Sequence, residues 1–448
     1  MYICKEHVIV NNMKSVNNHI VCKGGAALLS VLLPFLTTSF TLQPTPTKRS
    51  PTPQTVRLFE SKSDSIPYRI PAMTTCRNGD IIVAADYRYC GRDIGFGAID
   101  LHYRISKDGG HIWSTSLVMA DGTGDETAKP TPWNYAFGDC ALVADANSDE
   151  VLAICVGGKV PYFYGRRDKP TPVIAFRSYD NGKTWDQGQD ITEAIYSLFD
   201  RRKKGPVNAL FMASGKIHQS RYVKVERYNR IYSALATRSG NYVVFSDDFG
   251  RSWKVLGDIN MSPVADGDEP KCEELPDGSV IISSRTKGRF FNIFTFTDLQ
   301  QAKGSWQQRM RATDMDDIDN SCNGDILLLP VVRTADKQSV WIALQSVPFG
   351  PKRNNVGFFF HELTDTHEDV KAFAEHWMRG LQVSYGASAY STMSLLKSGL
   401  IAFAWEEGPT EYNIDFRTFC LKDITLGNYS LDKKFKRKLT ALQEKQGL

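Results

Sequence analysis

The chain has 448 residues, of which 42% are hydrophobic and 23% charged, with 34 glycines and 20 prolines. This composition argues against a disordered, collagen-like or disulfide-framework protein and predicts an ordinary folded chain. The 54 Lys and Arg residues against 50 Asp and Glu residues leave a net charge of +4 without a long basic stripe. The charge therefore does not indicate nucleic-acid binding.

The N-terminal residues 1–41 have the layout of a secretory signal peptide. Lys14 and Lys23 precede an apolar run at residues 26–36, which then gives way to small polar residues. A membrane span needs about 20 apolar residues, so we expect no permanent membrane span in the mature protein. Met13 is a candidate for the true start. We therefore expect export to the periplasm, the cell surface or the extracellular medium.

A Pro/Thr-rich segment at residues 42–55 predicts an extended linker, which is followed by a folded domain at 56–422 and a tail or helix at 423–448. The cysteines form no CxxC pair and the eight histidines are scattered, so no zinc site is predicted. A bridge between Cys140 and Cys155 is conceivable, although nothing in the sequence supports it.

Short segments of the folded domain alternate apolar and polar residues, which is the pattern of half-buried β-strands. The clearest lie at residues 80–85, 99–105, 241–245, 279–284, 339–345, 356–361 and 400–405, separated by Gly, Asp and Asn. Helical periodicity is rare, and its best examples are 191–199 and 368–381. The chain is therefore predicted to be all-β.

One element, S-x-D-x-G-x-x-W, occurs at residues 106–113, 178–185 and 246–253, with a degraded copy at 298–306. Its Asp closes a turn, its Gly adopts a backbone angle that other residues avoid, and its Trp is expected to fold back onto the sheet, so each copy predicts a β-hairpin. The copies start 178 − 106 = 72 and 246 − 178 = 68 residues apart, which is room for about four strands. Dividing the 367 residues at 56–422 by a repeat of roughly 65 gives about six units, which predicts a six-bladed β-propeller of four-stranded antiparallel blades.

A further motif, Tyr68-Arg69-Ile70-Pro71, stands upstream of these repeats. The combination resembles the exo-α-sialidase (neuraminidase) family, in its bacterial Asp-box form similar to glycoside hydrolase family 33, over essentially residues 56–422. The family's hallmarks are a [FY]-R-I-P motif and repeated Asp boxes. The resemblance implies a propeller enzyme that acts on sialylated glycans without a metal or organic cofactor.

The resemblance implies three arginines that clamp the carboxylate of sialic acid. Arg69 of the Y-R-I-P motif is the first, Arg285 follows a segment of the form E-x-x-x-x-E-L-x-D-G-S, and Arg353 is the best fit for the third. Glu406, in A-W-E-E-G, resembles the glutamate that orients the first arginine. Three cations at one point repel each other, so the set makes physical sense only with an anionic guest and a carboxylate nearby.

The catalytic residues implied by the resemblance are Tyr390, Glu269 and Asp93. The anomeric carbon of sialic acid carries a carboxylate, so an Asp or Glu nucleophile would be repelled whereas a neutral tyrosine would not. A phenol has a pKa of about 10 and needs a base, for which Glu269 is the natural partner of Tyr390. Asp93 is expected to protonate the leaving oxygen and then to activate water.

Three further residues are candidates for substrate contacts. Arg88 resembles the family arginine that touches the sugar hydroxyl at C4, and Asp139 resembles an aspartate on the same side of the pocket. Surface salt bridges are the alternative role of both. Trp133 is a candidate wall for the N-acyl group, with core packing as the alternative.

We predict a secreted exo-α-sialidase that releases terminal sialic acids from glycoproteins, glycolipids and oligosaccharides with retention of configuration. An intramolecular trans-sialidase, which would use the same residues and release anhydro-sialic acid, is the close alternative. A propeller lectin that binds sialylated glycans and an Asp-box protein with a structural role are alternatives from other classes. The presence of Tyr390, Glu269 and Asp93 argues against the lectin, and the arginines argue against the structural role.

Overall fold

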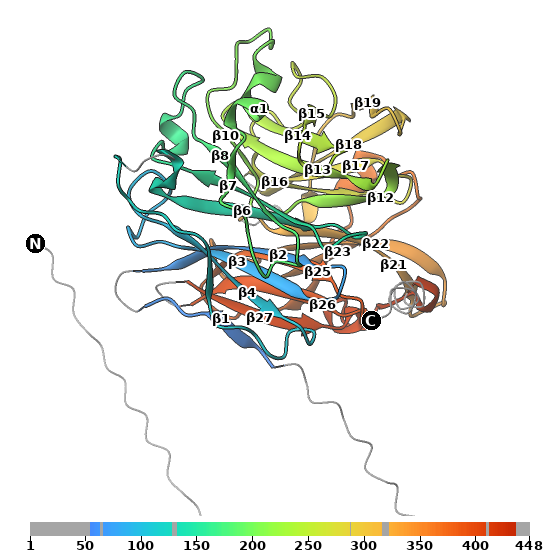
Figure 1. Ribbon diagram of the computed structural model, residues 1–448. Coiled ribbons are helices and arrows are strands. Elements are labelled where there is room, and N and C mark those ends of the chain that lie inside the picture. Colours follow the sequence, from blue (N-terminus) through green and yellow to red (C-terminus); the bar gives the residue numbers. More distant parts are fainter. Residues whose placement is uncertain are drawn as a thin grey trace, which may run out of the picture. The chain divides into compact units, whose positions relative to one another are not determined.

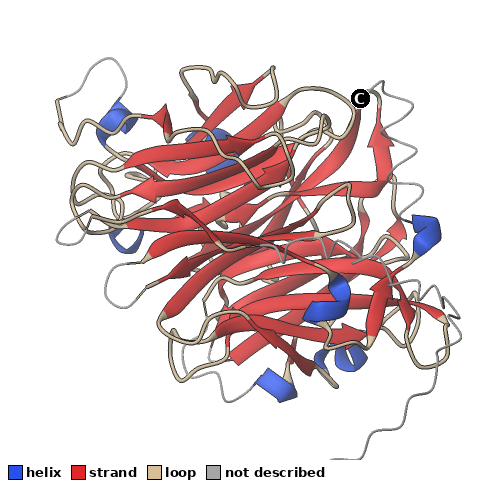
Figure 2. Cartoon of the chain, turned by 90° about the horizontal axis from the view of Figure 1, so that it is seen from below, coloured by secondary structure: helices blue, strands red, loops and turns tan. Residues whose placement is uncertain are grey.

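The computed structural model describes residues 54–62, 66–127, 132–286, 288–315, 322–408 and 412–435. The expected signal peptide lies outside the described residues, as does the expected linker up to residue 53. Strands make up most of the described chain and the helices are few and short, as Figures 1 and 2 show. The all-β prediction is confirmed.

The strands form six sheets that follow one another along the chain as the blades of a β-propeller. Blade one contains β2 (Tyr68–Thr75), β3 (Ile81–Tyr87), β4 (Asp100–Ser106) and β5 (Leu117–Ala120). Blade two contains β6 (Phe137–Ala144), β7 (Val151–Gly157), β8 (Val173–Ser178) and β9 (Gln189–Asp190). Blade three contains β10 (Leu210–Met212), β12 (His218–Val225), β13 (Tyr228–Thr237), β14 (Gly240–Ser246) and β15 (Lys254–Val255).

The second half of the chain forms the other three blades. Blade four contains β16 (Asp268–Glu274), β17 (Val280–Thr286), β18 (Gly288–Asp298), β19 (Lys303–Trp306) and β20 (Met310–Arg311). Blade five contains β21 (Asp325–Arg333), β22 (Ser339–Pro348), β23 (Val356–Glu362) and β24 (Met378–Gln382). Blade six contains β25 (Ser388–Leu395), β26 (Ile401–Glu407) and β27 (Asn413–Phe419).

Three short strands join blades that are distant from them in the sequence. β1 (Val56–Phe59) pairs with β27 and so completes blade six with the N-terminal end of the fold. β28 (Tyr429–Leu431) pairs with β21, so the propeller extends beyond the boundary expected at residue 422. β11 (Gly215–Lys216) pairs with β6 in parallel. The six predicted blades are present, and four of them carry a fifth strand.

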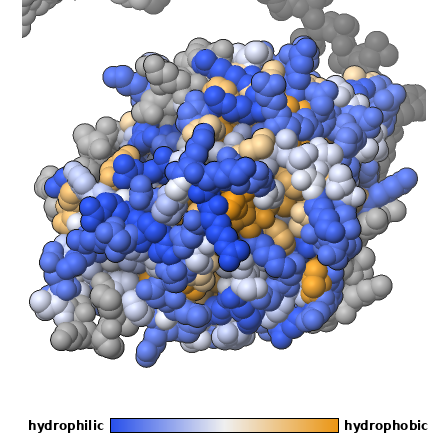
Figure 3. Space-filling model, turned by 90° about the horizontal axis from the view of Figure 1, so that it is seen from above, coloured by the Kyte–Doolittle hydropathy of each residue, from blue (hydrophilic) through white to orange (hydrophobic). Residues whose placement is uncertain are grey.

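The apolar cores of the propeller lie between neighbouring blades. Leu101 of blade one and Leu142 of blade two, for example, share one buried cluster, and similar clusters join each further pair around the ring. Burying these side chains stabilises the ring, because each blade face removes the apolar surface of the next from water. Figure 3 shows that the surface of one face is mostly hydrophilic, with apolar residues in small groups.

The S-x-D-x-G-x-x-W segments form the turns between the last two strands of blades one to three. In the first copy the Ser106 hydroxyl donates to Asp108 Oδ1 (2.9 Å), which also accepts the backbone N–H of Ile112 (2.9 Å). The other two copies repeat both hydrogen bonds. The ring of Trp113 lies 4.9 Å from that of Phe416 in blade six. The tryptophan of this copy therefore packs against the neighbouring blade, and not only onto its own sheet as expected.

Of the two helical segments predicted from the sequence, one is helical over nearly its whole length and the other only in part. α1 (Thr192–Tyr196) and η3 (Ser197–Phe199) occupy the region expected to be helical at 191–199. The helix expected at 368–381 is wrong beyond α2 (Val370–Ala374), because His376 has a left-handed backbone (φ 62°) and the chain then enters β24.

The remaining helices are short: α3 (Leu421–Ile424), η1 (Pro132–Tyr135), η2 (Tyr162–Tyr164) and η4 (Thr313–Met315). No helix in the described ranges is long and apolar enough to cross a membrane.

Candidate active site

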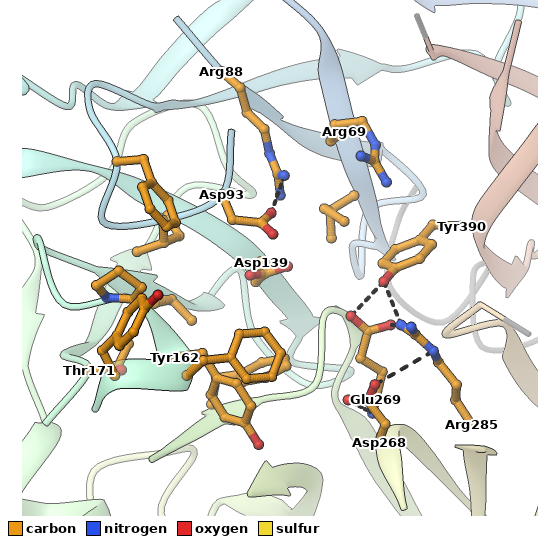
Figure 4. A pocket seen from close by; sticks show the side chains of 18 of the residues that line it. Arg69, Arg88, Asp93, Asp139, Tyr162, Thr171, Asp268, Glu269, Arg285 and Tyr390 are labelled. Atoms are coloured by element: carbon orange, nitrogen blue, oxygen red, sulfur yellow. Dashed lines mark hydrogen bonds and ion pairs between the residues drawn. The ribbon is translucent and has the colours of Figure 1, made fainter. Parts of the chain in front are cut away.

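A cavity of about 470 Å³ opens where the inner strands of the propeller begin. Arg69 is the second residue of β2, Asp139 the third of β6, Glu269 the second of β16 and Tyr390 the third of β25. All four side chains line the cavity, as Figure 4 shows. Residues that lie up to 390 − 69 = 321 positions apart in the sequence therefore meet, because they occupy equivalent places in different blades.

The pairing of each of these strands with its neighbour is irregular at the cavity. Bulges of this kind re-aim side chains and are common next to active sites. In addition, Ile70 (φ 57°) and Asp139 (φ 52°) have left-handed backbones, which non-glycine residues adopt only at an energetic cost. The register shifts fall between Arg69 and Ala72, Gly138 and Ala141, Asp268 and Lys271, and Ser388 and Ser391.

Tyr390 and Glu269 form the central pair of the cavity. The Tyr390 hydroxyl donates to Glu269 Oε1 (2.6 Å). Arg285 Nη1 lies 2.7 Å from Glu269 Oε2 and 2.9 Å from the Tyr390 hydroxyl. Burial and the negative charge of Glu269 raise the pKa of the Tyr390 phenol well above its usual value, although Arg285 and Arg353 act against this shift. The phenol is therefore neutral at pH 7 and its proton points at a carboxylate.

The three predicted arginines surround this pair. The guanidinium carbon of Arg353 lies 5.1 Å, and that of Arg69 5.7 Å, from the centroid of the Tyr390 ring. Among the described residues, the buried Nε of Arg353 has no hydrogen-bond partner. Buried polar groups are rarely left unpaired in folded proteins. The three guanidinium groups around the cavity thus offer a site for a carboxylate, whose negative charge would offset the repulsion between the three cations.

Glu406 lies behind the cavity, fully buried, and holds two of its residues in place. Its carboxylate accepts hydrogen bonds from Arg69 Nε (2.7 Å) and from the backbone N–H groups of Ile70 (2.9 Å) and Tyr390 (3.1 Å). Burial alone would raise the pKa of Glu406, but the charge of Arg69 and these hydrogen bonds hold it below its usual value. The geometry agrees with the orienting role that the sequence predicts.

The opposite side of the cavity contains Arg88 and three carboxyl groups. Arg88 Nη2 donates to the buried Asp86 (2.8 Å), and its Nη1 contacts Asp93, whose side chain is 75% exposed. The backbone N–H of Asp139 donates to Asp86 (3.0 Å). Burial raises the pKa of Asp86 to about 6, and burial together with the charge of Asp86 raises that of Asp139 well above its usual value. Asp86 and Asp139 therefore keep their protons to a higher pH than exposed aspartates do.

Several cavity residues were not predicted from the sequence. Asp268 lies 3.6 Å from Arg285, and its position directly before Glu269 was the only available signal. An aromatic wall is formed by η2, whose Phe163 and Tyr164 are 76% and 72% exposed at the cavity. Trp133, considered as a wall for the N-acyl group, is not a lining residue, because it packs against the apolar core between blades one and two.

Neither a metal nor a disulfide contributes to the site within the described ranges. No group of three or more His, Cys, Asp or Glu side chains there could hold a metal ion. Cys140 and Cys155 are both free and buried, so the bridge considered between them is not formed.

Comparison with known proteins shows a likeness to sialidases. No protein-family model matches the chain. The sialidase of Micromonospora viridifaciens is 26% identical over 361 residues, which are 76% of this chain and 50% of that protein. Solved structures share the fold of the chain: a Hadza microbial sialidase has a TM-score of 0.61 at 18% identity, covering 81% of this chain and 67% of that one.

A second solved structure, the intramolecular trans-sialidase of Ruminococcus gnavus, has a TM-score of 0.62 at 15% identity and covers 83% of this chain and 98% of that one. The chain spans about half the length of the curated relatives it matches.

Proposed function

We propose that the protein is an exo-α-sialidase that hydrolyses the bond between a terminal sialic acid and the rest of a glycan, with retention of configuration. The observation that carries the proposal is the hydrogen bond between Tyr390 and Glu269 (2.6 Å) at the centre of three arginines. A site for binding alone needs the arginines, whereas a phenol aimed at a buried carboxylate is what nucleophilic catalysis requires.

Binding begins at the arginines. The carboxylate of sialic acid lies between Arg69, Arg285 and Arg353, whose guanidinium groups donate hydrogen bonds to it. Glu406 fixes Arg69 for this contact. The same carboxylate brings the anomeric carbon next to the Tyr390 hydroxyl, because Arg285 contacts both the phenol oxygen and the space where the anion would lie.

The first chemical step forms a bond between the Tyr390 oxygen and the anomeric carbon. Because the pKa of the phenol is raised, free phenolate is scarce, and the proton must pass to Glu269 as the bond forms. Asp93 gives a proton to the departing glycosidic oxygen. Asp93 is suited to this role because it lies at the exposed side of the cavity, where the leaving sugar must depart.

The second step reverses the first. Asp93 removes a proton from water, the water oxygen attacks the anomeric carbon, and the Tyr390 oxygen leaves and regains its proton from Glu269. Two displacements at one carbon give net retention. Throughout both steps Arg88 holds Asp93 by a charge-assisted hydrogen bond. Asp86 in turn anchors Arg88 and accepts a hydrogen bond from the backbone N–H of Asp139.

The substrates we propose are sialylated glycans, in which sialic acid is attached to further sugars. The exposed rings of Phe96, Phe163 and Tyr164 at the cavity support this, because exposed aromatic groups beside a pocket provide an apolar surface for the next sugar ring. Export remains part of the proposal and rests on the signal-like segment at residues 26–36.

Time-resolved NMR of a sialylated oligosaccharide tests the proposal. We expect the α-anomer of free sialic acid to appear first and the β-anomer to follow by mutarotation. Anhydro-sialic acid, which is lighter by one water, would identify an intramolecular trans-sialidase instead. Binding without turnover that is lost in Arg69→Ala would identify a lectin.

A further inference from the structure

The proposed acid, Asp93, lies on the segment that joins β3 to β4 in blade one, residues 88–99, which we call the acid loop. Arg88 at the start of this loop contacts the Asp93 carboxylate, as Figure 4 shows. The Asp93 side chain is 75% exposed, and an ion pair whose carboxylate is open to water fixes a side chain weakly. The position of the acid therefore depends on the contacts that hold the acid loop.

One of these contacts is apolar. Ile94, the residue after Asp93, is buried in a small cluster with Val156 of blade two and Phe211 of blade three. Tyr162 of η2 packs against the same cluster, and its ring lies edge-on to that of Phe211 with the centroids 5.2 Å apart. The acid loop is thus seated on blades two and three, although it belongs to blade one.

A second contact joins the acid loop to η2 directly. Gly95 has a left-handed backbone (φ 94°), and a Cβ there would lie 2.6 Å from both Cδ and Cγ of Pro161 and 2.7 Å from its backbone nitrogen. Cβ atoms in proteins essentially never lie closer than 3.0 Å to such atoms, so the site accepts glycine alone. Pro161 directly precedes η2, and its ring cannot swing away because it closes on the backbone nitrogen.

η2 is itself held by blade three. Arg238, directly after β13, donates from Nη1 to the main-chain oxygens of Phe163 (3.1 Å) and Gly165 (3.3 Å). Gly165 also packs closely, since a Cβ there would lie 2.9 Å from Thr171 Oγ1 and 3.0 Å from Ala209 Cβ. These contacts make η2 a fixed support for the acid loop.

We propose that Pro161 is a positioning residue for Asp93: its close contact with Gly95 keeps the acid loop, and with it the Asp93 carboxyl, within reach of the departing glycosidic oxygen. A placed acid typically contributes about 10²–10⁴-fold to a rate, and a displacement of about 1 Å can cost about 100-fold. This inference rests on the proposed function, because it takes Asp93 as the acid.

The test compares Gly95→Ala with Gly79→Ala as a matched control. Gly79 lies in the turn between β2 and β3 of the same blade and has nearly the same backbone angle (φ 95°), but a Cβ there would meet no heavy atom of the described residues within 4 Å. Both changes add one methyl group at the same backbone strain, and only the change at Gly95 pushes the acid loop away from Pro161. Pro161→Ala tests the same support without a clash, because it removes the ring that Gly95 contacts.

The assay is kcat/KM on a series of aryl sialosides whose leaving groups run from nitrophenol to unsubstituted phenol. An electron-poor phenol departs without protonation, whereas phenol itself needs the acid, so the dependence of kcat/KM on leaving-group acidity reports how well the acid is placed. The parameter covers the steps up to the covalent intermediate, so the later role of Asp93 in activating water does not enter. Every leaving group carries one aromatic ring, so a displaced aromatic wall would lower all the rates equally.

We expect Gly95→Ala to lower kcat/KM by roughly 10- to 100-fold for the phenyl sialoside and by less than about threefold for the nitrophenyl sialoside. Pro161→Ala should steepen the dependence in the same direction, and Gly79→Ala should keep that of the wild type. A wild-type dependence in both Gly95→Ala and Pro161→Ala, or a uniform loss across the series, would overturn the proposal.

Asp93→Asn supplies the reference for a lost acid and should give the steepest dependence of the set. An inactive wild type would contradict the proposed function itself. A wild-type dependence in Asp93→Asn would refute the acid role of Asp93 and this inference with it.

Discussion

Replacement of Glu406 by glutamine tests whether a buried carboxylate organises the arginine site. Glu406 is fully buried and accepts two hydrogen bonds from Arg69 (2.7 and 3.4 Å), one from Ile70 and one from Tyr390. In Glu406→Gln an NH₂ group replaces one of the two acceptor oxygens, so a hydrogen-bond donor faces the donors of Arg69 or of the backbone. Arg69 also loses its counter-charge. Leaving one partner of a buried ion pair typically lowers the free energy of unfolding by about 3–5 kcal/mol.

The assays are thermal unfolding and steady-state kinetics. With an unfolding entropy of about 2.1 cal/mol/K per residue, a domain of nearly 400 residues should lose roughly 4–6 °C in Tm. An Arg69 that is no longer fixed should weaken substrate binding by about 1.5–3 kcal/mol, which is roughly a 10- to 100-fold increase in KM.

A neighbouring carboxylate supplies the control. Glu407 accepts hydrogen bonds from Trp405 (2.7 Å) and Ser384 (3.0 Å) and contacts no arginine of the site, so Glu407→Gln should change Tm less and leave KM as it is. The reasoning is refuted if Glu406→Gln melts with the wild type and binds substrate equally well.

Three further predictions follow from the same geometry. Tyr390→Phe should lower kcat by about 10³-fold or more while Tm stays within a few degrees, because the hydroxyl takes part in chemistry but in only two hydrogen bonds; a kcat near that of the wild type would argue against a tyrosine nucleophile. Free sialic acid should raise the Tm of the wild type, by the equivalent of about 2.7 kcal/mol at 100 times Kd, and Arg353→Gln should lose most of this shift in calorimetry. The raised pKa values of Asp86 and Asp139 mean that the folded protein holds more protons than the unfolded chain above about pH 4, so these groups reduce stability as pH rises toward 7. Asp139→Asn should therefore gain Tm relative to the wild type between pH 5 and 7, and an equal difference at both pH values would contradict the shift.

The fold was predictable where its signals are local. Each Asp-box turn is closed by its own serine and aspartate, so three copies at regular spacing were enough to predict six blades. The register shifts and the positive φ of Asp139 arise from packing around the central axis, and no short segment encodes them.

The errors have the same origin. β11 and β28 pair with residues that lie 74 and up to 100 positions away in the sequence, and they are only two and three residues long, so periodicity cannot detect them. The helix expected at 368–381 ends early because β24 finds its partner in β23, a tertiary contact that overrides the local pattern. Whether Trp133 lines the pocket or packs in the core is decided by tertiary packing alone, which the local sequence does not reveal.

The site residues were predictable only through the resemblance to sialidases. Arg69, Glu269, Arg285 and Tyr390 come from three blades, and no spacing in the sequence brings them together. Asp86, which anchors Arg88, was overlooked because it reads as an ordinary strand residue.

The most direct test of the account is to trap the covalent intermediate. A sialosyl fluoride that carries a second fluorine at C3 should react, since fluoride leaves readily while the added fluorine slows the loss of the adduct. Peptide mapping by mass spectrometry should then find the fluorosialyl group on Tyr390, and the modified enzyme should recover activity as water releases it. An adduct on Glu269, or continued turnover of natural substrate without any adduct, would contradict the claim that Tyr390 is the nucleophile.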